Sequence, residues 1–244
     1  MLVNIIEILD RSTQGMTRPF LCKDELGRLF YVKGRNAARR GLIAEWLCAR
    51  LATAFGLPVA PYAIVHVPEP LIEAASDPEV RELGGGAAFG SQRVPNVLEI
   101  SWMQAQRVPQ WLRRDILVFD WWVRNDDRNL TQLGGNPNLL WDTSRAQLVV
   151  IDHNAAFSMD FSATDFRRTH IFAAEWTGIV EDWIHRSHYQ QRLANAYAML
   201  EEALASCPPS WFWADFGVPA QFDPEAVRFA LRRFDQPDFW DLAP

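Results

Sequence analysis

The stretch FDWWVRNDDRNL, residues 119–130, sets two adjacent acids beside two tryptophans at the end of a largely apolar run. Aspartate is rarely buried without a partner, so Asp126 and Asp127 mark either a polar helix end or a place where carboxylates do chemistry. An acid at the C-terminal end of a helix is mildly unfavourable, because the helix dipole puts partial negative charge there. The side chains that converge on these acids therefore decide between the two interpretations.

A second set of oxygen-bearing side chains flanks a predicted β-hairpin. The runs 139–141 and 148–151 are apolar and are separated by the turn-forming segment DTSRA. If the two runs pair antiparallel, Asn138 and Asp152 lie side by side at one end of the hairpin. An amide oxygen and a carboxylate suit Mg²⁺, and no His or Cys stands in zinc-ligand spacing. The pattern predicts a magnesium site to which Asp127 adds a carboxylate from upstream.

The N-terminal part of the chain offers groups that suit nucleotide phosphates. Lys33 lies near the end of the predicted strand FYVKG, and Glu45 follows on a predicted helix with small neighbours on its face. A strand lysine paired with a glutamate of the next helix positions the phosphates in protein kinases. The turn between the first two strands is predicted to cover phosphates, although GxxxxGK[ST] and GxGxxG are both absent. Its candidate residues are Ser12, Thr13, Gln14 and Gly15.

The elements that must position these residues change in character near residue 104. Before it, β-rich runs surround one helix that begins near Arg39 and is ended by Gly56 and Pro58. The predicted strands cover 4–9, 18–23, 28–33, 59–67 and 97–102, and no strand is assigned to the Gly-, Pro- and Ser-rich stretch 82–96. After it, helices are predicted over 108–125, Ala174–Arg186, Tyr189–Ala205 and Pro224–Phe234, the last with Asp223 as N-cap. The pattern predicts a β-rich lobe, 1–104, and a mostly helical lobe, 105–244, that holds the hairpin.

Composition narrows the class of protein. With 244 residues, 49% of them hydrophobic and 22% charged, the chain can bury a substantial core. A net charge of −6 argues against direct nucleic-acid binding. Three cysteines without a CxxC pair indicate a reducing compartment. Because neither a signal peptide nor a long uncharged apolar run is present, we expect a cytoplasmic protein with no membrane partner.

In their order along the chain, these features resemble kinases of the HipA-like family, which are related in fold to type II phosphatidylinositol 4-kinases. The order is a strand Lys, a helix Glu, then RNDDRNLTQLGGNPNLLW and LVVIDHNAAF. That family carries an N-x-D-R catalytic loop, an asparagine just before a short apolar strand, and I-D-x-x-x-A-F in place of D-F-G. The resemblance covers roughly residues 5–160 and is strongest over 124–157.

The resemblance implies an α+β, bilobal protein-kinase-like fold that uses ATP and Mg²⁺. It implies that Asp127 is the catalytic aspartate beside the acceptor hydroxyl and that Asn138 and Asp152 bind the metal. It further implies that Lys33 contacts the α- and β-phosphates and that Glu45 holds Lys33.

The chain departs from the kinase pattern in two places. The gap between Asp127 and Asn138 is longer than in H-R-D-x-x-x-x-N, with LTQLGG as the surplus, so Asn136 and Asn129 remain alternative metal ligands. His153 and Asn154 stand where the Phe-Gly of D-F-G would be, so we expect no Phe-driven switch. The chain also begins almost at the kinase core, as a compact version of the family would.

For activity, the resemblance implies a toxin-like Ser/Thr protein kinase. Its substrate would be a protein, with translation-related targets such as aminoacyl-tRNA synthetases as examples, and an antitoxin or other regulator is a possible partner. Ser12 and Thr13 are candidates for autophosphorylation. Two alternatives stay open, namely a nucleotide-binding pseudokinase that serves as a regulatory module and a kinase-fold enzyme that transfers AMP.

Overall fold

The computed structural model describes residues 3–13 and 17–241, so Gln14 and Gly15 of the predicted phosphate loop lie outside the described residues. The chain divides into two compact units, and each is described separately. Unit 1 contains Met1–Trp46, Ala60–Pro95 and Cys207–Phe222, and unit 2 contains Leu47–Val59, Asn96–Ser206 and Asp223–Pro244. Strands dominate the first unit and helices the second, so the mixed strand and helix content predicted from the sequence is confirmed.

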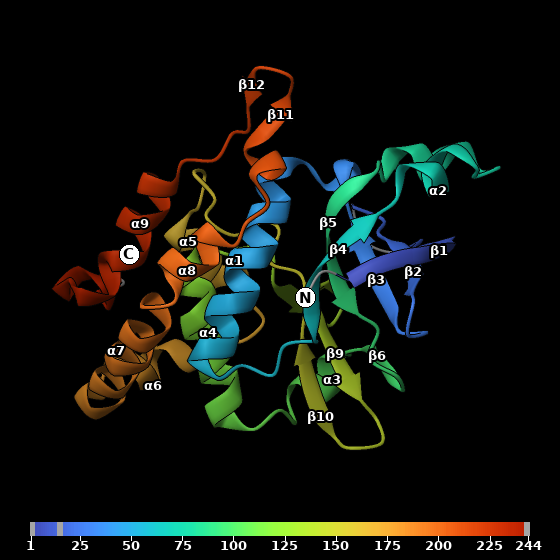
Figure 1. The fold of residues 1–244 in the computed structure, drawn as a ribbon. Helices are drawn as coiled ribbons and strands as arrows, with labels where there is room; N and C mark the ends of the chain where they lie inside the picture. Colours follow the sequence, from blue (N-terminus) through green and yellow to red (C-terminus); the bar gives the residue numbers. More distant parts are fainter. Residues whose placement is uncertain (1–2, 14–16, 242–244) are drawn as a thin grey trace. The chain divides into compact units, whose positions relative to one another are not determined.

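A closed five-stranded barrel forms the body of unit 1 (Figure 1). Its strands are, in spatial order, β1 (Val3–Arg11), β2 (Phe20–Asp24), β3 (Leu29–Lys33), β5 (Gly86–Gln92) and β4 (Tyr62–Val67). The parallel pairing of β1 with β4 closes the barrel. Alternating side chains of these strands fill its interior, among them Ile5, Phe20, Cys22, Phe30 and Val65. The four predicted strands of this region are confirmed.

Strand β5 lies in the stretch to which the sequence analysis assigned no strand. It pairs with β3 on one side and with β4 on the other, so it is a central strand of the barrel. A Cβ at Gly90 would come within 2.6 Å of Val65, which shows that the strands approach too closely there for a side chain. The glycine that made this segment read as a loop is therefore required by the barrel itself.

The remaining elements of unit 1 are short. They are η1 (Arg35–Ala37), the first part of helix α1 (Arg39–Phe55), α2 (Glu69–Glu73), η2 (Pro78–Glu82), η4 (Pro209–Phe212), β11 (Trp213–Asp215) and β12 (Val218–Pro219). The C-terminal segment is joined to the barrel by Trp211, whose indole Nε1 donates to the carbonyl of Ala87 at 2.9 Å. Unit 1 thus combines two parts of the chain that are far apart in sequence.

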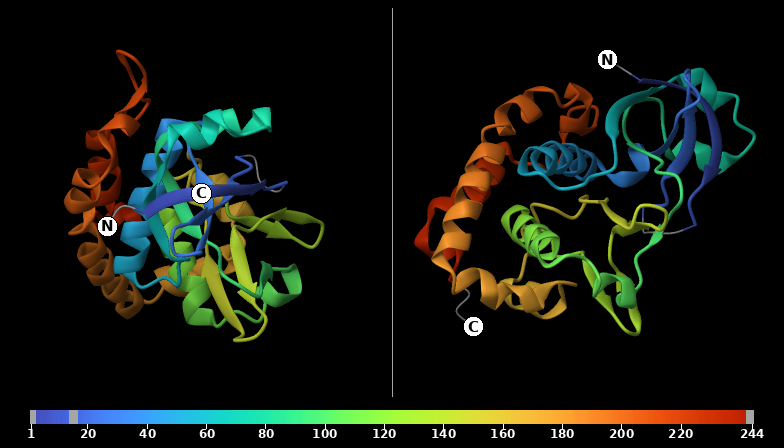
Figure 2. Two further views of the ribbon diagram at one scale, coloured as in Figure 1. Left: turned by 45° about the vertical axis from the view of Figure 1, so that its right-hand side comes forward. Right: turned by 90° about the horizontal axis from the view of Figure 1, so that it is seen from below.

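Helix α4 (Gln110–Val123) is the central element of unit 2. It is buried on nearly all sides, as its apolar sequence predicted. Trp121 and Trp122 each donate an indole hydrogen bond, to the carbonyl oxygens of Phe239 (3.0 Å) and Leu231 (2.7 Å). The second half of α1 lies alongside α4, as Figure 2 shows, through contact of Phe55 with Phe119. The helix ends where Arg124 adopts a left-handed backbone with φ of 54°.

Unit 2 also contains two small sheets, formed by chain segments before and after helix α4. Strands β6 (Val97–Glu99), β9 (Leu139–Asp142) and β10 (Gln147–Val150) form a sheet in the order β10-β9-β6, and α3 (Trp102–Ala105) follows β6. Leu139 lies opposite Val150, so the predicted hairpin is confirmed. Its register is one residue away from the predicted one: Asn138 lies opposite Ile151 rather than Asp152, because the pairing of Asp142 with Gln147 at the turn fixes the register. The surplus LTQLGG forms a second hairpin of β7 (Asn129–Thr131) and β8 (Gly134–Asn136), which the sequence analysis did not predict.

The helices that complete unit 2 differ in their bounds from the prediction. They are α5 (Ala163–Thr169), η3 (Ala173–Glu175), α6 (Trp176–Val180), α7 (Trp183–Tyr197), α8 (Leu200–Ala205), α9 (Pro224–Arg232), η5 (Arg233–Asp235) and η6 (Pro237–Phe239). The predicted helix 174–186 is wrong because Asp182 caps a new helix through the N–H groups of Ile184 and His185. The predicted N-cap Asp223 is confirmed, since its carboxylate accepts from the N–H of Glu225. No helix in the described part of the chain is long and apolar enough to cross a membrane.

Candidate active site

The open end of the β9–β10 hairpin places Asn138 and Asp152 in adjacent strand extensions. The N–H of Ile151 donates to the carbonyl oxygen of Asn138 at 3.2 Å, which continues the pairing one step beyond Leu139 and Val150. Both Asn138 (φ 47°) and Asp152 (φ 56°) have left-handed backbones. Such a conformation persists in non-glycine residues only where the surroundings hold it, and it is frequent at functional sites.

Asp127 is held at the same end of the hairpin by two side-chain amides. Its Oδ2 accepts from Nδ2 of Asn136 at 2.8 Å and from Nδ2 of Asn138 at 3.2 Å. A carboxylate oxygen can only accept, so the amide orientation of Asn138 follows from the chemistry and its own Oδ1 faces away from Asp127. Within the part of the chain that the structure describes, Oδ1 of Asp127 accepts no hydrogen bond. Asn129 instead serves the β7–β8 hairpin, where its Oδ1 accepts from the N–H of Asn136.

The donors at this end of the hairpin are oxygens of the kind that Mg²⁺ prefers. The Asp152 carboxylate and the Asn138 amide oxygen would supply one charged and one neutral ligand from the extensions of neighbouring strands. Among the described residues, no three His, Cys, Asp or Glu side chains converge as a metal cage would require. Mg²⁺ is commonly held by one or two carboxylates together with water and substrate phosphates rather than by a complete protein cage. The donor set therefore fits Mg²⁺ bound with a nucleotide, and it does not fit zinc.

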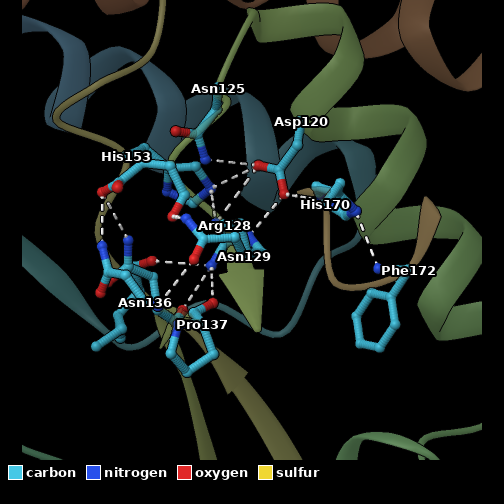
Figure 3. Close-up of polar contacts among 12 residues, drawn as sticks. Asp120, Asn125, Arg128, Asn129, Asn136, Pro137, His153, His170 and Phe172 are labelled. Atoms are coloured by element: carbon cyan, nitrogen blue, oxygen red, sulfur yellow. Dashed lines mark hydrogen bonds and ion pairs between the residues drawn. The ribbon is translucent and has the colours of Figure 1, made fainter. Parts of the chain in front are cut away.

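Arg128 lies at the centre of a buried polar network, which Figure 3 shows. Its Nε donates to Oδ2 of Asp120 at 2.6 Å. Its Nη1 donates to the carbonyl oxygens of Pro137 (3.2 Å), Asn138 (2.6 Å) and Ile151 (3.4 Å). These carbonyls belong to the two segments that carry the predicted metal ligands. One fully buried guanidinium thus ties both segments to helix α4.

The acid that balances this guanidinium is Asp120, which is itself fully buried on α4. Burial raises the pKa of Asp120, but Arg128 and His170 outweigh that effect and hold the pKa well below its ordinary value. Nδ2 of Asn125 donates to Oδ1, and Nε2 of His170 lies 3.0 Å from Oδ2. Nδ1 of His170 accepts from the N–H of Phe172, so its proton is on Nε2, facing Asp120. A neutral imidazole has one donor and one acceptor nitrogen, which is what these two contacts require. Burial lowers the pKa of His170, which also favours the neutral ring.

His153 follows Asp152 and is buried against the same network. Its Nε2 lies 3.1 Å from Nη2 of Arg128, which can only donate, so this ring nitrogen is an acceptor. The ring also meets Phe119 edge-on at 5.5 Å. The residue that replaces the Phe of D-F-G thus joins the polar network, in addition to packing against the core.

In unit 1, the structure brings together the two residues that the sequence analysis paired. Lys33 is the last residue of β3, Glu45 lies on α1, and Nζ of Lys33 forms an ion pair with Oε1 of Glu45. Both side chains are buried, with 8% and 4% of their surfaces exposed. A buried pair of this kind places the ammonium by a rigid strand and a rigid helix.

The described residues of the predicted phosphate loop lie where β1 ends. Ser12 is half-buried, and its N–H donates to the carbonyl of Pro19 at 2.9 Å, while Thr13 is exposed. Asp126 was interpreted as a polar residue at the helix end, without a catalytic role. Burial raises its pKa, and the nearby carboxylates of Asp127 and Asp165 raise it further. Two negative charges close to Asp126 make it a poor position for another anion.

Sequence reasoning missed the residues that support the site, above all Asp120, Arg128 and His170. One signal was available, since Asp120 is an acid inside the apolar run ILVFDWWV and needs a buried cation. The identity of that cation was not available. The chain reverses at the left-handed Arg124, and this reversal, which helical spacing does not predict, returns Arg128 to Asp120.

The barrel of unit 1, the helical unit 2 and the oxygen-lined hairpin end define a phosphotransferase of the kinase type, and comparison with known proteins agrees. A family model described as HipA-like kinase matches residues 5–243, and the chain belongs to that family. A solved structure titled as a Helicobacter pylori proinflammatory kinase, CtkA, resembles the chain with a TM-score of 0.53 and 8% identity. The match covers 96% of this chain and 92% of CtkA and concerns the fold. A search of curated proteins found no match.

Proposed function

We propose that this chain transfers the γ-phosphoryl group of ATP, with Mg²⁺, to a serine or threonine hydroxyl of a protein. The observation that carries the proposal is the Asp127 carboxylate, which two amides orient through Oδ2 while Oδ1 accepts no hydrogen bond among the described residues. A carboxylate fixed in this way suits a group that receives the proton of an attacking hydroxyl.

In this mechanism, Asp127 aligns the acceptor hydroxyl with the γ-phosphorus through Oδ1. The bond from the hydroxyl oxygen to phosphorus forms as the bond to the bridging oxygen breaks, the hydroxyl proton passes to Asp127, and ADP leaves. Asp152 and Asn138 would hold Mg²⁺, which, when bound, neutralises charge on the phosphate oxygens. Asn136 is the alternative amide ligand.

Unit 1 supplies the groups for the nucleotide in the same proposal. Lys33 would contact the α- and β-phosphates, and Glu45 would hold its ammonium by the buried ion pair. The loop containing Ser12, Thr13, Gln14 and Gly15 would cover the phosphates. Because catalysis of phosphoryl transfer is mainly positioning and electrostatic stabilisation, these contacts are expected to affect both nucleotide affinity and rate.

The finer parts of the proposal concern the biological setting. Family membership supports a toxin-like protein kinase, with translation-related proteins such as an aminoacyl-tRNA synthetase as candidate substrates and an antitoxin or regulator as a candidate partner. We infer action in the cytoplasm, in agreement with three buried cysteines, none of which stands in a CxxC pair.

Adjacent acids provide a matched test of the assignment. We would follow transfer of label from γ-³²P-ATP to protein in a dephosphorylated cell lysate, comparing Asp127→Asn with Asp126→Asn. Loss of a general base typically costs about 10²–10⁴-fold in rate, so Asp127→Asn should fall by that amount while Asp126→Asn stays near wild type. Equal effects of the two substitutions would contradict the assignment of Asp127.

A further inference from the structure

Two arginines of unit 2 carry buried nitrogen atoms that lack hydrogen-bond partners. Arg124 ends helix α4, and Arg233 begins η5. Nε of Arg124 and Nη2 of Arg233 are both buried and unpaired within the described part of the chain. Both arginines are half-buried and neither guanidinium forms an ion pair among these residues, whereas the buried carboxylates of Asp115 and Asp120 have charged partners. Unsatisfied buried donors of this kind indicate that an acceptor is needed.

The two guanidinium groups are close enough to affect one another. Burial and, to a smaller extent, the positive charge of Arg124 together lower the pKa of Arg233 to about 10, with Asp238 acting in the opposite sense. Burial also lowers the pKa of Arg124. Like charges that are partly removed from water repel each other, so this arrangement is unfavourable until an anion joins it.

A hydroxyl group lies on the chain segment next to this pair. The N–H of Phe157 donates to the carbonyl of Val123 at 2.7 Å, and the residues that follow this bonded pair are Ser158 and Arg124. Ser158 is half-buried, and its Oγ accepts from the N–H of Asp160 at 3.2 Å. The backbone bond between Phe157 and Val123 therefore fixes the start of this segment next to the end of helix α4, and Ser158 directly follows Phe157.

The same segment and Arg233 share one tryptophan as a neighbour. The ring of Phe161 lies 5.5 Å from that of Trp121, and the guanidinium of Arg233 lies 5.5 Å from the Trp121 ring. Ser162, the next serine, is committed elsewhere, because its Oγ accepts from the N–H of Asp165 as the cap of α5. Of these two serines, Ser158 is the one that directly follows Phe157, the residue bonded to the neighbour of Arg124.

We propose that Ser158 is a phosphorylation site and that Arg124 and Arg233 bind its phosphoryl group. A phosphoserine carries nearly two negative charges and three acceptor oxygens, which two arginine forks can satisfy together with the N–H of Asp160. The modification would fix the segment that follows Asp152 and so regulate the candidate active site, in the way that charge-driven ordering of a loop does in other kinases.

The source of the phosphoryl group rests on the proposed function, with ATP as donor and a second copy of the chain as the enzyme. The bond from Oγ of Ser158 to the γ-phosphorus forms, the bond from that phosphorus to the β–γ bridging oxygen breaks, and ADP leaves. The proton of the serine hydroxyl passes to Asp127 of the acting copy and then to water. Recognition by the arginines does not depend on which enzyme performs this step.

The arginine contact can be tested without kinase activity. Phosphoserine is incorporated genetically at position 158 of the full chain, in an Asp127→Asn background, and its second pKa is followed by ³¹P NMR; phosphoserine at the exposed Ser210 is the control. We expect the pKa at position 158 to lie lower by about one unit or more, as for a charge paired with a nearby cation. Arg124→Gln and Arg233→Gln should each reduce the difference. Equal titration at the two positions, or a difference that survives both substitutions, would overturn the proposal.

The modification is tested by mapping phosphopeptides of the wild-type chain after incubation with ATP and Mg²⁺. Phosphate at Ser158 that is missing from Asp127→Asn supports the proposal. Phosphate at other residues or on lysate proteins, but never at Ser158, overturns this proposal and leaves the proposed function standing. Transfer to no protein at all overturns the proposed function, while the titration above still decides whether the arginines bind a phosphoryl group.

Discussion

Replacing Arg128 by methionine removes a guanidinium that is fully buried between helix α4 and the hairpin end. Methionine has a comparable length and fills much of the space, so the substitution mainly removes charge and donors. Asp120 would keep the contacts of Asn125 and His170 but lose its charged partner. In addition, the Asn138 carbonyl oxygen would lose the 2.6 Å bond from Nη1.

The expected loss of stability follows from the buried charge. Breaking a buried ion pair by removal of one partner costs about 3–5 kcal/mol, because the remaining charge is uncompensated. For a chain of this size, a loss of 1 kcal/mol lowers Tm by about 2–4 °C, which gives a decrease of about 6–20 °C for Arg128→Met. Arg128→Lys keeps the charge but only part of the donor fork, so its decrease should be smaller.

Thermal unfolding followed by circular dichroism, combined with a double-mutant cycle, tests the reasoning. In Arg128→Met/Asp120→Asn no unpaired charge remains buried, so the loss should be smaller than the sum of the two single losses by about 1 kcal/mol or more. In the folded Arg128→Lys variant, the Mg²⁺ concentration needed for half-maximal transfer should rise about 10–100-fold, since supporting contacts of metal ligands act on affinity. Additive single effects, or a Tm of Arg128→Met within about 2 °C of wild type, would refute the role given to the network.

Three further predictions concern buried groups. His170 has a folded-state pKa below its ordinary 6.5, so on acidification the unfolded chain takes up a proton before the folded chain does. The contribution of His170 to the free energy of unfolding should therefore be constant above pH 6.5 and fall below it by at most about 1.4 kcal/mol per pH unit. Thermal melts of His170→Gln between about pH 7.5 and about pH 5.5 should lack this slope. Lys33→Met should lower the free energy of unfolding by about 3–5 kcal/mol, as measured by denaturant unfolding. The double variant Lys33→Met/Glu45→Gln should lose less than the sum of the two single losses, and an additive result would argue against the buried pair. Arg192→Met should destabilise by a similar amount in the same assay, because both its Nη atoms donate to the buried Asp115, and a loss below about 1 kcal/mol would contradict this.

The fold could be predicted from the sequence where local pattern and tertiary packing agree. The β9–β10 hairpin has two apolar runs around a polar turn and forms as predicted, but its register differs by one residue, because the pairing of Asp142 with Gln147 at the turn sets it. Strand β5 was missed because Gly90 is selected by the close approach of Val65, which belongs to another strand. The break between α6 and α7 was missed because a single cap, Asp182, interrupts a sequence that is otherwise compatible with one helix.

The candidate site divides in the same way. Asp127 and Asp152 were predicted because they stand in motifs whose spacing is local, and the positions expected for them meet at one end of the hairpin. The network of Asp120, Arg128 and His170 joins residues up to 50 positions apart, and no periodicity relates them. Such long-range polar contacts can be predicted only if the chain reversal at Arg124, at the end of α4, is already known.

The central claim is transfer of the γ-phosphoryl group by a site that needs Asp152. The most direct measurement is mass spectrometry of the chain and of a dephosphorylated lysate after incubation with ATP and Mg²⁺, with wild type beside Asp152→Ala. We predict peptides heavier by one phosphoryl group for wild type and none above background for Asp152→Ala. Peptides heavier by AMP, the same products from both proteins, or binding of ATP by wild type without any transfer would contradict the account.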